Sequence, residues 1–205
     1  MSEPADTAPT DFTRREALAL LAALPLAAAV DPSALAARAW RHIAAAASAH
    51  GAPYTPQFFS AAEWRTVRCL TDEILPRDER SGSASEAGVP EFVDFIMVDQ
   101  PRTQHAMREG LRWIDAQCAA RFAVPLADCT VPQRASVLDD IAWPARARPE
   151  MAQGVAFFTV FRNLTAAGFW TSQMGMADLR YMGNTVVPEW RGCPPEALAK
   201  LGVTY

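Results

Sequence analysis

The feature that most constrains the fold is a helix start followed by apolar residues at helical spacing. Ser60 and Glu63 have the residue types and the separation of a capping box, which closes the first turn of a helix. From Trp64 onward apolar side chains recur every three or four residues, and Pro76 ends the pattern. These apolar positions are Trp64, Val67, Leu70 and Ile74. The stretch therefore predicts an amphipathic helix between Ser60 and Pro76.

Similar signals recur along the chain, and no segment alternates between apolar and polar residues as a half-buried strand would. After Pro101 an apolar stripe is expected on a long helix, formed by Met107, Leu111, Ile114, Cys118 and Phe122. The remaining helices are expected at 33–50, 91–99, 130–142 and about 150–167, with a short one within 196–205. The prediction is an all-α protein, with a single helical domain at 31–205 and an irregular C-terminal segment.

The expected helix at 150–167 differs from the others because its large apolar residues do not form one stripe. They are Phe157, Phe158, Val160, Phe161 and Leu164, and at helical spacing they face several directions. Two interpretations remain open at this point. The helix is either central in the bundle or in contact with another protein.

The N-terminal 30 residues have the pattern of an export leader. Arg14 and Arg15 precede an apolar run at 17–30, an order typical of a twin-arginine signal, although Ala17 stands where that signal usually has Phe or Leu. The run is shorter than the about 20 residues that span a bilayer. An alanine-rich helix packed on the domain is the alternative, but the leucines of the run surround most of the helix. Whether the leader is cleaved or kept as an anchor stays open.

Few residues have the spacing of a catalytic or binding site. The net charge is −4, and no basic block interleaves with aromatic residues, which argues against nucleic-acid binding. Motifs for dinucleotides, for phosphates and for a nucleophile elbow are absent, as is the CxxC spacing of a haem or zinc site. The histidines His42, His50 and His105 are expected at the surface. We therefore expect no catalytic, cofactor-binding or metal-binding residue in this chain.

The segment from Gly168 to Pro195 is dense in aromatic residues, glycines and methionines, and poor in surface charge. This composition is typical of a protein interface, where aromatic residues and methionine are enriched. Alternatively, the aromatic side chains close the core of the chain's own domain. If the segment is an interface, the expected contact residues are Phe169, Trp170, Met174, Tyr181 and Trp190.

Several motifs together resemble the gluconate 2-dehydrogenase subunit 3 family, and their order along the chain is specific. They are the twin arginine, the stretch from Phe58-Phe59 to Leu75-Pro76, AGVPEFVD at 87–94, GFWTS at 168–172, DLxYxGN at 178–184 and WxGCP at 190–194. They cover most of the chain from residue 12 onward. The resemblance implies a small, non-catalytic subunit of a periplasmic, membrane-associated sugar or polyol dehydrogenase.

The resemblance also implies partners. The large subunit would be a flavoprotein of the glucose-methanol-choline (GMC) type that holds FAD and the substrate, and a c-type cytochrome with haem c would take the electrons onward. The small subunit would carry the export signal for both chains, and membrane association would come through the partner or an uncleaved leader. The C-terminal part is more similar to the branch that pairs with pyranoside-oxidising flavoproteins than to the gluconate branch. A free-standing exported helical binding or structural protein is the alternative, and a subunit catalytic by itself is a third.

The periplasmic location that the resemblance implies is oxidising, so the four cysteines are candidates for disulfide bonds. Cys118 and Cys129 are close enough in sequence to close a short loop, a link worth roughly 2–4 kcal/mol. Cys118 also lies on the apolar stripe, so a buried, inert thiol is its other interpretation. Cys193 could bridge to a partner or to Cys69, and the pairing stays open.

Overall fold

Helices make up most of the chain that the structure describes. The computed structural model describes residues 32–50, 54–181, 183, 188–189 and 192–203. The helices are α2 (Pro32–His50), α3 (Ala61–Ile74), α4 (Val89–Asp99), α5 (Gln104–Phe122), α6 (Val131–Ala142), α7 (Ala152–Thr171), α8 (Gln173–Asp178) and α9 (Pro195–Leu201), with 3₁₀ helices η2 (Pro101–Thr103), η3 (Leu126–Asp128) and η4 (Pro149–Met151). No strand occurs within these described ranges, so the predicted all-α class is confirmed. The domain boundary at residue 30 stays a prediction.

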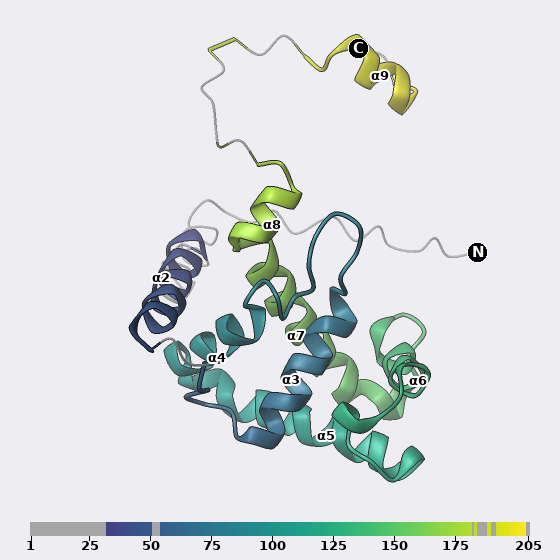
Figure 1. Ribbon diagram of the computed structural model, residues 1–205. Helices are drawn as coiled ribbons and strands as arrows, with labels where there is room; N and C mark the ends of the chain where they lie inside the picture. Colours follow the sequence, from purple (N-terminus) through teal and green to yellow (C-terminus); the bar gives the residue numbers. More distant parts are fainter. Residues whose placement is uncertain (1–31, 51–53, 182, 184–187, 190–191, 204–205) are drawn as a thin grey trace, which may run out of the picture.

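Helix α7 lies at the centre of the bundle (Figure 1). It is 20 residues long and packs against α2, α3, α4, α5, α6 and α8. The first of the two interpretations of the 150–167 stretch, a central helix, is therefore confirmed. Its position also means that α7 is held from several sides and forms a rigid support for whatever surface it exposes.

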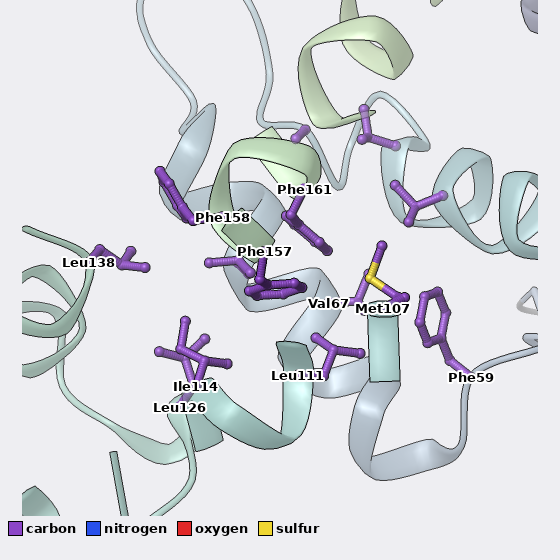
Figure 2. Packing of buried hydrophobic residues seen from close by; sticks show 14 of the residues in the cluster. Phe59, Val67, Met107, Leu111, Ile114, Leu126, Leu138, Phe157, Phe158 and Phe161 are labelled. Atoms are coloured by element: carbon purple, nitrogen blue, oxygen red, sulfur yellow. The ribbon is translucent and has the colours of Figure 1, made fainter. Parts of the chain in front are cut away.

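The core forms where α7 faces α3 and α5, and Figure 2 shows the side chains that fill it. Phe161 on α7 is fully buried, as are Val67 on α3 and Leu111 on α5. The ring centroids of Phe157 and Phe161 are 5.6 Å apart. The predicted apolar stripe on α5 faces this core, because its residues from Met107 to Cys118 are buried.

Two glycines allow α5 and α7 to approach closely. A Cβ atom on Gly110 of α5 would lie 1.9 Å from the ring of Phe157, and one on Gly154 of α7 would lie 2.2 Å from the ring of Trp113. Each helix therefore presents a bare backbone position to an aromatic ring of the other. Glycine in a helix interior costs about 1 kcal/mol relative to alanine, and here the close ring packing offsets that cost.

The predicted capping box is present at the start of α3, and a second one begins α6. The backbone N–H of Ser60 donates to the Glu63 carboxylate at 2.9 Å, and the N–H of Glu63 donates to Ser60 Oγ at 3.3 Å. At α6 the N–H of Thr130 donates to Gln133 Oε1 at 2.8 Å. These starts could be read from the sequence because both partners of each box lie within one helical turn.

Helix α2 packs on α4 and α7 through one side. Ala36 and Ala39 are buried. The indole N–H of Trp40 donates to Thr171 Oγ1 at 3.0 Å, and the Trp40 ring stacks on Phe92 at 5.6 Å. The small alanine side chains let α2 lie close to its neighbours, and Leu35, Trp40 and Ile43 also pack against the core.

A buried carboxylate joins the segment before α3 to α4. Asp94 on α4 is fully buried. Its Oδ2 atom accepts hydrogen bonds from the Tyr54 hydroxyl at 2.9 Å and the Gln57 N–H at 2.8 Å, and its Oδ1 atom accepts from the N–H groups of Phe58 and Phe59 at 3.0 and 3.2 Å. The four bonds fix the segment that leads into α3. This role is not visible in the sequence, because the partners are 35 or more residues away.

The polar segment at 76–88 is a loop that contacts both α3 and α8. The N–H of Ser85 donates to Asp72 Oδ1 of α3 at 2.7 Å. Arg80 forms an ion pair with Asp178 of α8, with 2.8 Å between Nη2 and Oδ1. The loop therefore connects α8 to the end of α3.

Candidate protein-interaction surface

The predicted C-terminal contact residues divide between the core and the surface. Phe169 is 2% exposed and belongs to the core, which is the alternative that the composition left open. Trp170 and Tyr181 are 36% and 53% exposed, and Met174 is half-buried. Trp190 lies outside the described residues. Trp170 and Tyr181 are therefore the members of the predicted set that a partner could reach most readily.

Helix α8 adds exposed apolar side chains, Met176 and Leu179, close to the end of α7. Ser172 begins α8, and its Oγ accepts the N–H of Gly175 at 3.0 Å. A Cβ atom on Gly175 would lie 2.0 Å from the carbonyl oxygen of Phe169. Glycine is thus required for the tight turn that places α8 directly after α7.

The solvent-facing side of α7 carries almost no charge. Six of its eight exposed residues recur at alternating intervals of three and four, the spacing with which one helix packs along another, and Ala152 and Arg162 are the other two. The six are Gln153, Ala156, Val160, Asn163, Ala167 and Trp170, and we call them the outer face of α7. Arg162 is the single charged residue of α7. The described residues of this chain leave the outer face uncovered.

A groove of about 550 Å³ adjoins the outer face, between α4, α5 and α7. Its walls are mainly apolar, and they include Ile96, Met97, Met107, Phe157, Val160 and Leu164. Arg102, which also lines the groove, is exposed and makes no ion pair with any residue that the structure describes. The groove therefore combines an apolar floor with one uncompensated positive charge. The sequence signal related to this groove was that the large apolar residues of the 150–167 stretch face several directions.

The described titratable residues form no catalytic cluster. His42 and His105 are exposed, as predicted, and the side chain of His50 lies outside the described part. Among the described residues, no group of three or more His, Cys, Asp or Glu side chains is arranged to hold a metal ion. The outer face and the groove are therefore the surface features that call for a functional explanation.

The buried cysteines have the properties of inert thiols. Burial, followed by the neighbouring Cys129, raises the pKa of Cys118 to about 12, and burial raises the pKa of Cys69 to about 11. Both groups are protonated at neutral pH, whereas nucleophilic or metal-binding cysteines are thiolates. In the described chain Cys69, Cys118 and Cys129 form no disulfide. The Cys118–Cys129 link and a bridge at Cys193 stay predictions.

Glu91, in the first turn of α4, is a second carboxylate held away from water. Its Oε2 atom is buried and has no hydrogen-bond partner among the described residues. Burial raises the pKa of Glu91; its own backbone N–H and Arg68 oppose this rise, and Asp94 adds to it. The ionised form of Glu91 is therefore less favourable in the folded protein than in the unfolded chain.

Replacing Glu91 with glutamine is expected to reduce the loss of stability between about pH 4 and about pH 7. Because the folded-state pKa of Glu91 is raised, the unfolded chain releases this proton first. The contribution of Glu91 to stability therefore falls as the pH rises from the unfolded to the folded pKa. Urea unfolding of the wild type and the variant at both pH values measures how much the free energy of unfolding changes with pH in each protein. Any effect of the amide that does not depend on pH is the same at both values and cancels in this comparison.

The control for this experiment is Asp78→Asn, which is expected to leave the change in stability between about pH 4 and about pH 7 nearly unaltered, because the folded-state pKa of Asp78 is lowered below its ordinary value. The N–H groups of Ser81 and Arg80 each donate to Asp78 Oδ1 at 2.8 Å and lower the pKa of Asp78. Its stabilising effect is present above the unfolded pKa and is lost as the pH falls through the folded pKa. If both variants changed the pH dependence in the same direction, burial of Glu91 would not be the cause.

The export signal cannot be placed in the structure, because Arg14 and Arg15 lie outside the described residues. None of the helices in the described part has both the length and the apolar character needed to cross a bilayer. The twin-arginine leader at 1–30 therefore stays a prediction.

The fold and this surface define an all-helical protein suited to contact another protein. A family model described as Gluconate 2-dehydrogenase subunit 3 matches residues 61–188, which is more than half of the chain. The chain belongs to this family, whose description makes it a subunit of a gluconate dehydrogenase complex. No curated protein and no solved structure gives a significant match. The matched range runs from α3 to beyond α8 and includes both the outer face and the groove.

Proposed function

We propose that the chain is the non-catalytic small subunit that stabilises a GMC-type flavoprotein and escorts it through folded-protein export to the periplasm. The flavoprotein would hold FAD and oxidise a sugar of the pyranoside or gluconate type. A c-type cytochrome subunit with haem c would carry the electrons onward. The partner or an uncleaved leader would keep the complex at the inner membrane.

The observation that carries this proposal is the outer face of α7. On this face Val160 is 55% exposed and Trp170 is 36% exposed, and a second protein that covers these apolar side chains removes them from water. Met176 on α8 and Leu179 directly after α8 extend the exposed apolar surface beyond the outer face. A stable pair of proteins buries about 1,600 Å² in total, so a surface that runs over α7 and α8 suits such a contact.

In this function the chain's own residues bind and support but do not transfer electrons. Helix α7 is packed against six other helices, so its outer face is ordered before a partner arrives. Preorganisation of this kind lowers the entropic cost of association. By covering apolar surface on the flavoprotein, the small subunit would stabilise the folded state of its partner through binding linkage.

Export is tested by replacing Arg14 and Arg15 with lysine in cells that also express the flavoprotein. A twin-arginine signal depends on both arginines, whereas lysine conserves their charge. We expect most of the flavin-linked dehydrogenase activity to remain in the cytoplasm with this variant, while wild-type cells carry it in the periplasm. The measurement is activity with an artificial electron acceptor in the two cell fractions.

The matched control replaces Arg146 and Arg148 with lysine, two exposed arginines of the folded body. This control is expected to leave the distribution of activity unchanged. Full periplasmic activity with the Arg14, Arg15 double variant would contradict the escort role. Purification of the wild-type chain as a monomer without any flavoprotein would favour the free-standing alternative.

A further inference from the structure

We propose that the outer face of α7 and the adjoining groove bind one amphipathic α-helix of the flavoprotein, with an acidic residue beside its apolar stripe. This inference rests on the proposed function and adds which kind of element the partner supplies. It commits to a helix rather than to a strand, a small ligand or a second copy of this chain.

The spacing of the outer face favours a helix as the occupant. The six residues alternate between intervals of three and four, which matches the a and d positions of packed helices. From Gln153 to Trp170 the face extends about 26 Å along the α7 axis. Ala156 and Ala167 are small, and small side chains let a second helix backbone approach closely. An edge strand would instead meet contact residues at every second position.

The groove provides the place where the partner helix would insert its large apolar side chains. Val160 is 55% exposed and belongs both to the outer face and to the wall of the groove. Opposite it the wall is formed from α4 and α5, with Met97 and Met107 among its residues. Both methionines are almost fully buried, so they form the base of the groove. A groove that is continuous with a helix-spaced face fits the ridge of another helix.

The charge at the groove predicts that the partner helix carries a negatively charged residue there. Arg102 lines the groove and has no ion pair among the described residues. The nearby Glu109 already pairs with Arg112, at 2.5 Å between oxygen and nitrogen. The uncompensated charge is therefore positive. A carboxylate next to the apolar stripe of the partner helix would complement it, and charges at such edges contribute mainly to orientation.

Photo-crosslinking of the intact complex tests the inference. The full chain, with a photoreactive amino acid in place of Ala156, Val160 or Ala167, is co-expressed with the flavoprotein and irradiated. We expect all three positions to crosslink to one segment of the flavoprotein. The crosslinked residues of that segment should be three or four positions apart, in an order that corresponds to the order of the three sites along α7. Val131 on α6, which is 61% exposed, is the matched control and is expected to give no crosslink.

Two substitutions add a quantitative readout. Val160→Arg places a charge in the groove and is expected to weaken the complex at least about tenfold, whereas Val131→Arg should leave it unchanged. Arg102→Gln is expected to weaken it less and to make it less sensitive to salt. Because Val160 and Val131 are both exposed, the thermal unfolding of the free variants should match that of the wild type.

The outcomes separate this inference from the proposed function. If FAD-containing flavoprotein co-purifies but the three positions crosslink to scattered segments, to a second copy of this chain or to nothing, the inference is wrong and the proposed function stands. Unchanged affinity of Val160→Arg would likewise overturn the inference alone. If no flavoprotein co-purifies with the wild-type chain, both fail.

Discussion

Replacing Asp94 with alanine is expected to lower the free energy of unfolding by about 3–4 kcal/mol. The carboxylate accepts four hydrogen bonds from the segment at 54–59 and is fully buried. Alanine leaves those donors without an acceptor, and orphaned buried donors cost more than the net value of a hydrogen bond. Urea unfolding of the full chain, followed by circular dichroism and tryptophan fluorescence, measures the change.

Tyr54→Phe is the graded control for this prediction. It removes one of the four donors and leaves the three backbone bonds to Asp94 intact. The expected loss is about 1 kcal/mol. If Asp94→Ala cost no more than Tyr54→Phe, the backbone of the 54–59 segment would not depend on this carboxylate, and its role in positioning α3 would have to be rejected.

Phe161→Ala is expected to cost about 3–5 kcal/mol. The side chain is fully buried on the central helix and packs against the ring of Phe157 in the core that α3, α5 and α7 share. Alanine would lose the burial of the ring and leave a cavity that three packed helices cannot easily close. The same urea unfolding measures it, and a lower midpoint with an unchanged slope is expected.

The neighbouring residue supplies a matched control, since Val160 lies on the same helix but is 55% exposed. Val160→Ala is expected to change the free energy of unfolding by less than about 0.5 kcal/mol. A loss comparable to that of Phe161→Ala would show that the outer face of α7 is covered by this chain itself. A small effect on folding together with a large effect on partner binding would agree with the proposed surface.

The helices were predictable because their signals are local. The capping boxes at Ser60 and Thr130 and the apolar stripe from Met107 to Cys118 involve residues within one or two turns of each other. The structure confirmed these elements with boundaries close to the expected ones. The short C-terminal helix also forms, at Pro195–Leu201. Local backbone and side-chain preferences suffice for such features.

The contacts between helices were not predictable in the same way. Nothing in the sequence near Asp94 shows that its carboxylate meets the 54–59 segment. Gly110 and Gly154 look unfavourable in isolated helices, and their purpose appears only when Phe157 and Trp113 pack against them. The aromatic residue Phe169 matched an interface by composition, yet its burial places it in the core. Composition does not distinguish a buried aromatic side chain from one at a protein contact.

By itself, the sequence determined the all-α class, the main helices, the exposed histidines and the resemblance that the family comparison then confirmed. Periodicity, capping and motif order depend on residues that are close in the chain, which is why these features could be read directly. Only the tertiary structure decided that α7 is central, that its outer face is uncovered and that a groove adjoins it. These properties depend on which helices lie side by side, and that arrangement is set by contacts between residues far apart in the sequence.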